Sequence, residues 1–169
     1  MKNTNNRGMM LESIINKTNI FYLKNKIAMI HKKNLDVSFS KIKIENRKLL
    51  LKDAEIKSKS TVDYYGVFQG KFIAFEAKST EEKNFKLKNI KQHQLEYLSL
   101  IESFDGIAFW IIYFKMQNDF LIIKHKNLMK IISENKNTLA YKDAIAYGYS
   151  LNLDFPGILD YIKIVSHFF

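Results

Sequence analysis

The spacing of apolar and polar positions changes several times along the chain. Apolar side chains recur every three or four residues over 5–24, which predicts a helix. Short apolar runs predict strands at 27–31 and 37–45, and the apolar face of the second run switches midway, as at a bulge. The basic segment 46–60 has an apolar middle, so it could form either a helix or an extension that projects from the sheet.

The second half of the chain predicts further strands and helices around one sheet. Residues 106–116 are apolar on both faces, which is typical of a central strand. The other predicted elements are a hairpin, a polar connection, an amphipathic helix, a returning strand and two helices, at 61–78, 79–88, 89–104, 120–125, 127–136 and 139–148. The apolar tail is expected to dock on the core. We therefore expect residues 1–169 to form a single α/β domain, with one mixed central β-sheet flanked by helices.

Composition limits the possible chemistry. The chain has no cysteine, which excludes disulfides and thiolate metal sites, so a metal would need oxygen ligands such as Mg²⁺ or Mn²⁺ prefer. The N-terminus lacks the apolar core of a signal peptide. The longest apolar run, 107–114, is too short to span a bilayer as a helix. A cytoplasmic protein without a membrane partner is the expectation.

The chain carries an excess of positive charge. Lys and Arg number 27 against 17 Asp and Glu, a formal net charge of +10. Such an excess indicates a polyanionic partner, nucleic acid first and a membrane surface second. The alternative is a composition bias toward Lys, Asn and Ile.

Charged residues interrupt the predicted hairpin at 61–78. A two-residue turn at Gln69–Gly70 pairs residues whose numbers sum to 139, so a regular ladder places Asp63 opposite Glu76. The same ladder places Thr61 opposite Lys78. Opposed residues and residues two apart share a face, so all four side chains are expected to point the same way.

Two carboxylates this close repel each other unless a cation lies between them. A divalent metal satisfies Asp63 and Glu76, and the adjacent Lys78 could orient a water or neutralise charge on a phosphate. This pattern suits metal-assisted phosphodiester cleavage. The alternative is a cross-strand cluster of ion pairs on a solvated sheet face.

The arrangement resembles the PD-(D/E)XK nuclease superfamily. Further strings resemble one family within it, the RecU-type Holliday-junction resolvases: NRGMMLESIINKTNIFY at 6–22, IHKK at 30–33, STVDYYGVFQGKFIAFEAK at 60–78, NIKQHQ at 89–94 and PGILDYIK at 156–163. The resemblance implies a restriction-endonuclease-like nuclease core with a projecting stalk. It also implies a Mg²⁺-dependent homodimer that nicks four-way DNA junctions in pairs during recombination and repair.

The resemblance assigns roles in the site. The implied metal ligands are Thr61, Asp63, Glu76 and Gln94, and the implied catalytic residues are Asp63, Glu76, Lys78 and the more distant Glu12. Water would attack the phosphorus and a 3′-hydroxyl would leave, giving 5′-phosphate ends. Gln94 and Glu12 each have a simpler alternative as exposed polar residues of a helix.

The segment 46–60 corresponds in position to the family's stalk. Its apolar residues Leu49, Leu50, Leu51 and Ile56 could stack on exposed base pairs. The expected phosphate contacts are Arg7, Lys32, Lys33, Arg47, Lys48, Lys52, Lys57 and Lys59. The alternative for 46–60 is a helix packed on the core, and the alternative for the N-terminal cations is ordinary surface charge.

Two other functions stay open at this point. The chain could be a nuclease of the same superfamily that acts on other DNA. It could instead be a non-catalytic protein that binds branched DNA or the strand-exchange recombinase, which is also a possible partner of the enzyme.

Overall fold

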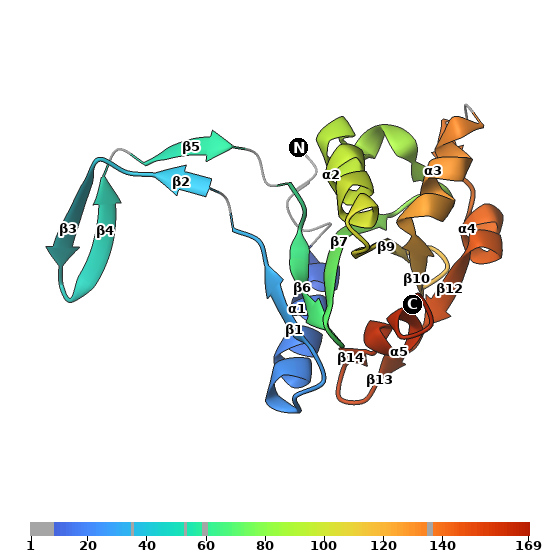
Figure 1. Cartoon of the computed structure of the whole chain (residues 1–169), viewed down its shortest axis with the longest axis horizontal. Helices are drawn as coiled ribbons and strands as arrows, with labels where there is room; N and C mark the ends of the chain where they lie inside the picture. The colour runs from blue at the N-terminus through green and yellow to red at the C-terminus, as the bar shows by residue number, and fades with distance from the viewer. Residues whose placement is uncertain (1–8, 35, 53, 59–60, 135–136) are drawn as a thin grey trace.

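A computed structural model describes residues 9–34, 36–52, 54–58, 61–134 and 137–169. A body of helices around one sheet carries a long two-stranded projection on one side (Figure 1). The expected mixed α/β class is confirmed, because the body is built on one mixed sheet with helices on both faces.

The central sheet has six strands in the order β1-β6-β7-β9-β10-β12. Their bounds are Met29–Lys32, Tyr64–Phe68, Lys71–Thr80, Ile107–Phe114, Asp119–Lys124 and Gly148–Leu151. Only the pairing of β7 with β9 is parallel among these described strands. Strand β9 is buried at every position, so the prediction of a central strand there is confirmed.

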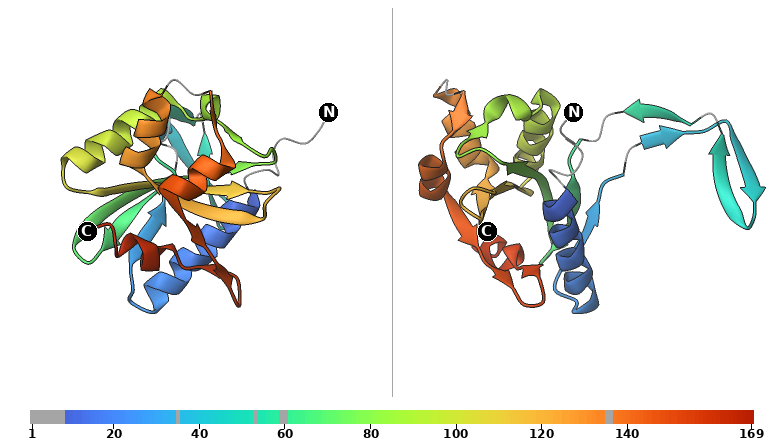
Figure 2. Two further views of the ribbon diagram at one scale, coloured as in Figure 1. Left: turned by 90° about the vertical axis from the view of Figure 1, so that its right-hand side faces the viewer. Right: turned by 180° about the vertical axis from the view of Figure 1, so that it is seen from behind.

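Helices cover the two faces of the sheet separately (Figure 2). One face packs against α1 (Met9–Lys24) and α5 (Tyr161–Val165). The other face packs against α2 (Gln92–Ser103), α3 (His125–Ser133) and α4 (Tyr141–Tyr147). The smaller elements are β8 (Phe85–Lys86), which pairs with β11 (Thr138–Leu139), a 3₁₀ helix at Leu87–Asn89, and β13 (Leu153–Asp154), which pairs with β14 (Ile158–Leu159).

The C-terminal tail docks on the core, as expected. The Tyr22 hydroxyl of α1 donates to a carboxylate oxygen of Asp160 at 2.8 Å, just before α5. The Leu159 N–H donates to the Thr18 hydroxyl at 3.0 Å. Both contacts join residues about 140 positions apart, so the two ends of the described chain hold one layer together.

The projection, here called the stalk, comprises β2–β5. Strand β2 (Asp36–Ser38) pairs with β5 (Glu55–Ser58), and β3 (Lys41–Glu45) pairs with β4 (Lys48–Lys52). The predicted single strand at 37–45 is thus two strands, and the helical alternative for 46–60 is wrong. Isolated from the core, the apolar side chains cannot stabilise a helix by packing, whereas the pairing of two extended strands satisfies the backbone.

Strand β12 was not predicted. The helical pattern of 139–148 continues to Gly148, but the helix ends at Tyr147, and β12 pairs with β10. A Cβ at Gly148 would lie 2.7 Å from the carbonyl oxygen of Ala144 and 2.8 Å from that of Ile122. Glycine therefore permits this close entry into the sheet. No helix in the described ranges is long and apolar enough to cross a membrane.

Candidate active site

The candidate site lies where β6 begins and β7 passes beside it. The hairpin register is confirmed from Phe68–Lys71 to Tyr64–Phe75, but the ladder ends there. Asp63 lies outside β6, and its carboxylate accepts the Ala77 N–H at 3.0 Å. The predicted backbone pairing of Asp63 with Glu76 is therefore wrong in detail, because a side chain takes the place of the ladder acceptor. The pairing of Thr61 with Lys78 is absent for the same reason.

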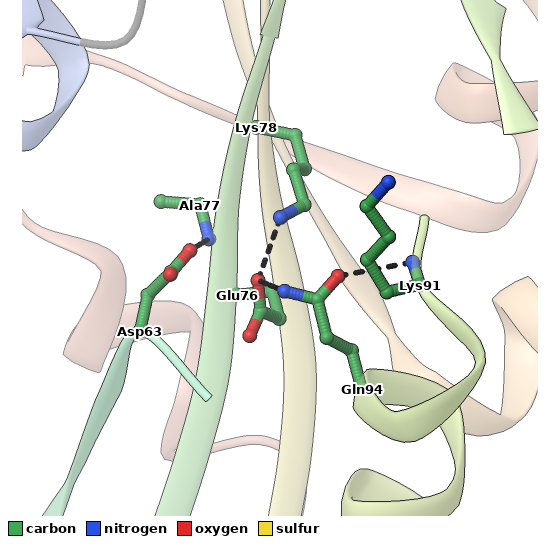
Figure 3. A network of polar contacts seen from close by, with 6 residues as sticks. All are labelled: Asp63, Glu76, Ala77, Lys78, Lys91 and Gln94. Carbon is green, nitrogen blue, oxygen red and sulfur yellow. Dashed lines mark hydrogen bonds and ion pairs between the residues drawn. The ribbon is translucent and has the colours of Figure 1, made fainter. Parts of the chain in front are cut away.

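Glu76 lies at the centre of a polar network and is fully buried (Figure 3). The Lys78 ammonium lies 2.8 Å from Glu76 Oε2. The Gln94 side-chain amide donates to the same oxygen at 2.6 Å, and its own oxygen accepts the Lys91 N–H at 3.1 Å. The alternative of a solvated ion-pair face is wrong for Glu76, and Gln94 is buried instead of exposed.

The surroundings of Glu76 disfavour its charge. Burial, and next the nearby Asp63 carboxylate, raise the pKa of Glu76 to about 8, and Lys78 opposes this rise. A buried carboxylate with one ammonium partner and a second carboxylate nearby is short of positive charge. An additional cation at this position would stabilise the ionised form.

A cavity of about 200 Å³ opens beside this network. Lys78 lines it from β7, Asp63 from the residue before β6, and Glu12 from α1. Glu12 forms an ion pair with Lys32, which also lines the cavity. The structure therefore brings Glu12 to the same cavity as the predicted acids, with its carboxylate engaged by a lysine.

Thr61 lies on the segment that returns from the stalk to β6. Its hydroxyl accepts a hydrogen bond from the Lys33 ammonium at 3.0 Å. The Lys33 N–H donates to the carbonyl oxygen of Asp63 at 2.8 Å. Two residues predicted for different roles, a metal ligand and a phosphate contact, are thus bonded to each other.

The donor set suits a hard divalent cation. Glu76 Oε1 is buried without a hydrogen-bond partner among the described residues, which is costly for a carboxylate oxygen. A cation held between Asp63 and Glu76 would satisfy it through oxygen ligands. In the described ranges no three His, Cys, Asp or Glu side chains cluster as a metal site.

The predicted DNA contacts lie on two parts of the molecule. Arg47 and Lys48 are exposed at the far end of the stalk, where β3 turns into β4. Lys52 and Lys57 belong to β4 and β5. Arg7 and Lys59 lie outside the described residues. The structure does not bring Arg47 and Lys48 to the carboxylates, because the stalk extends away from the body (Figure 1).

Sequence reasoning missed two contributors to the site. The Ala77 N–H fixes the Asp63 carboxylate, and the Lys91 N–H fixes the Gln94 amide. The second could have been found, because Lys91 precedes α2 and Gln94 occupies the third helical position, where Gln often caps the N-terminus. The first depends on where the ladder ends, and no local pattern marks that point.

Comparison with known proteins agrees with this architecture. The family model described as Recombination protein U matches residues 6–167. A protein of Leuconostoc citreum named Holliday junction resolvase RecU is 38% identical, over 96% of this chain and 82% of its own length. A protein of the same name from Mycoplasmopsis pulmonis is 37% identical, over 95% of this chain and 94% of its own.

A solved structure resembles the fold at low sequence identity. Hjc from Archaeoglobus fulgidus, described as a Holliday junction resolvase, matches with a TM-score of 0.50 and 11% identity, over 82% of this chain and 94% of its own. The two folds are thus similar, although little of the sequence is shared. The near-complete family match and the two relatives show that the chain belongs to the Recombination protein U (RecU) family.

Proposed function

We propose that this protein is an endonuclease that resolves four-way DNA junctions by paired nicks. The observation that carries the proposal is the pair of carboxylates, Asp63 and Glu76, with the Lys78 ammonium 2.8 Å from Glu76. Relatives named Holliday junction resolvase RecU cover most of the chain, which supports the substrate. Residues 1–169 would form one nuclease domain with its stalk.

Mg²⁺ is the proposed cofactor, with Mn²⁺ as a substitute. When bound, such a cation supplies a Lewis acid that activates water and offsets charge on the scissile phosphate. Asp63 and Glu76 would hold it, with Thr61 providing an oxygen and Gln94 contributing directly or through water. The partnerless Glu76 Oε1 and the buried carboxylate charge support this assignment.

The residues of the chain divide the remaining work. Lys78 reaches the cavity and would orient the attacking water or stabilise charge on the phosphate, because its ammonium is a compact donor. Gln94 keeps Glu76 in place through the 2.6 Å hydrogen bond. Glu12 and Lys32 at the other wall of the cavity would adjust the charge next to the DNA backbone.

The stalk is the proposed element that selects the junction. It exposes apolar side chains, including Ile44 and Leu49, beside Arg47 and Lys48. Apolar side chains can wedge against unstacked base pairs, and the cations can meet phosphates. A linear duplex offers no open centre for these side chains, so binding should favour branched DNA.

Paired nicks need two active sites, so we propose a homodimer. Helix α2 covers one sheet face over β7 and β9, but none of the described helices covers that face over β1 and β6, where Met29, Tyr65 and Val67 are exposed. Phe72 extends this apolar surface, and its ring stacks against Tyr65 with centroids 6.3 Å apart. A bare apolar sheet face of this kind is typical of a protein interface.

Cleavage of a labelled mobile four-way junction tests the proposal. The unmodified chain and Asp63→Ala are compared in Mg²⁺ at low salt, with a linear duplex of the same sequence as the control. We expect paired nicks in the junction from the unmodified chain only, and junction binding by both proteins.

The other outcomes separate the alternatives. Equal cleavage of the linear duplex would indicate another nuclease activity of this superfamily. Junction binding without cleavage by either protein, in Mg²⁺ and in Mn²⁺, would indicate a binding protein and reject the proposed chemistry.

A further inference from the structure

Lys33 lies at the junction between the body and the stalk. It follows the last residue of β1 and precedes β2 by three positions. Its side chain is half-buried, and its ammonium donates to the Thr61 hydroxyl at 3.0 Å. Its backbone N–H donates to the carbonyl oxygen of Asp63 at 2.8 Å. One residue therefore bonds the returning segment at two points.

The neighbouring lysine behaves differently. Lys32 is exposed and forms an ion pair with Glu12 across the cavity. Both residues belong to the string IHKK, and both are predicted from the sequence to contact phosphates. In the fold, only Lys33 turns toward the segment 61–63.

The segment 61–63 carries two of the proposed cation ligands. Asp63 is held at both ends, since its carbonyl oxygen accepts from Lys33 and its carboxylate accepts from the Ala77 N–H of β7. The Thr61 hydroxyl accepts a hydrogen bond from the Lys33 ammonium. In the chain, this segment follows the stalk strand β5 and precedes β6.

We infer that Lys33 is a positioning residue that fixes Thr61 and Asp63 for cation binding, and that its ammonium is not a phosphate contact. Substituting a residue that hydrogen-bonds a metal ligand, without itself touching the metal, commonly weakens metal affinity by about 10–100-fold. Lys33 also links the stalk to the site. It follows β1, where the chain leaves for the stalk, and it hydrogen-bonds Thr61 and Asp63, which come after the stalk in the chain. This inference rests on the cation site of the proposed function.

Binding of Mn²⁺ in the absence of DNA tests the inference. Free Mn²⁺ is measured by electron paramagnetic resonance in titrations of the full chain, Lys33→Met, Lys33→Arg and the control Lys24→Met, an exposed lysine at the end of α1. We expect Lys33→Met to bind Mn²⁺ about 10–100-fold more weakly and Lys24→Met to bind it like the unmodified chain.

The arginine variant separates positioning from charge. It keeps the positive charge but replaces a compact ammonium with a planar fork, so its hydrogen bond to the Thr61 hydroxyl would have a different geometry. We expect weaker Mn²⁺ binding with an unchanged salt dependence of junction binding, measured in EDTA. This variant also serves if Lys33→Met does not fold, as judged by circular dichroism.

Two results would overturn the inference in different ways. Normal Mn²⁺ affinity in both Lys33 variants, with a salt slope for Lys33→Met lower by about one ion, would make Lys33 a phosphate contact. No Mn²⁺ binding by the unmodified chain would remove the cation site itself, and the proposed cofactor with it.

Discussion

The body of the protein buries a charged side chain, and the stalk exposes apolar ones. Glu76 is 0% exposed in the middle of the sheet, whereas Leu49 is 70% exposed on β4. Both arrangements cost free energy in an isolated chain in water, because ions lose hydration when buried and apolar surface orders water when exposed. Each arrangement therefore indicates a binding partner that offsets its cost.

The two costs differ in kind. For Glu76 the unmet requirement is local and electrostatic, since one carboxylate oxygen has no hydrogen-bond partner in the part of the chain that the structure describes. For the stalk it is extended and apolar, since a two-stranded ribbon has no core of its own to cover Ile44 or Leu49. The proposed cation would meet the first requirement, and the proposed junction DNA would meet the second. Chemistry and recognition are thereby assigned to separate regions.

The largest expected effect comes from removing the buried charge. Glu76→Gln keeps the shape of the side chain but loses a proposed cation ligand, so junction cleavage should fall by about 10³-fold or more. Quantitative gel assays of nicking in Mg²⁺ measure this, and junction binding in EDTA should persist.

The control is Glu96→Gln, which changes an exposed carboxylate on the same side as Gln92 of α2. It should cleave normally. Residual activity of Glu76→Gln within tenfold of the unmodified chain would separate Glu76 from the chemistry.

The second expected effect is on the pH dependence of stability, and it arises in the body of the protein. His125 is buried between Trp110, whose indole N–H donates to Nδ1 at 3.1 Å, and Ser99, whose hydroxyl lies 2.8 Å from Nε2. Burial lowers the pKa of His125 to about 4. The folded pKa lies below the unfolded value of about 6.5, so the unfolded chain binds the proton first as pH falls.

The free energy of unfolding should therefore drop by roughly 3 kcal/mol between about pH 6.5 and 4 on account of this one residue. Urea denaturation across that range measures the drop. His125→Gln should be less stable at pH 7 but less sensitive to acid. An unchanged pH slope in this variant would show that other groups set the acid sensitivity.

A smaller effect is expected on the bare sheet face. Tyr65→Ala with Phe72→Ala should weaken self-association by about 10–100-fold, because central aromatic side chains dominate interface energies. Sedimentation equilibrium measures this, and single nicks should replace paired ones. Phe155→Ala, at a fully exposed turn between β13 and β14, is the aromatic control. Equal weakening by the control would point to non-specific association.

The smallest effect on folding is expected in the stalk. Leu49→Ser with Leu50→Ser should change the free energy of unfolding by less than about 0.5 kcal/mol, because neither side chain is buried. Junction affinity should fall about tenfold, since the wedge contacts are lost. Denaturation and junction binding are measured on the same samples, with Leu100→Ser on α2 as the exposed leucine control.

A large loss of stability in the leucine pair would mean that the stalk packs on something within the protein itself. Normal junction affinity of this double variant would show that the stalk leucines do not contribute to junction recognition. Either result would weaken the contrast between the two regions.

Local patterns predicted the hairpin and its acids well. The Gln69–Gly70 turn, with φ of 49° and 77°, fixed the register that brings Asp63 and Glu76 together. Such predictions succeed because a tight turn leaves few alternatives for the strands beside it. The helical and central-strand patterns at 89–104 and 106–116 succeeded for a similar reason, since each spans several turns or pleats.

Other features were missed because they depend on distant partners. The stalk strands β2 and β5 pair across about 20 residues, and nothing local distinguishes 46–60 from a helix. Strand β12 forms because the edge of β10 is available. Gln94 is buried because Glu76, 18 positions earlier, accepts its amide hydrogen bond.

The sequence by itself determined which chemical groups are present, the register of the hairpin, the positive charge and the membership of a family. The tertiary structure decided which of these groups meet. In the fold, Lys33 donates a hydrogen bond to Thr61 and Lys32 forms an ion pair with Glu12, although the two lysines are adjacent and chemically identical. The reason is physical: neighbouring residues of an extended chain point in opposite directions, and the elements packed on each side decide what each one finds.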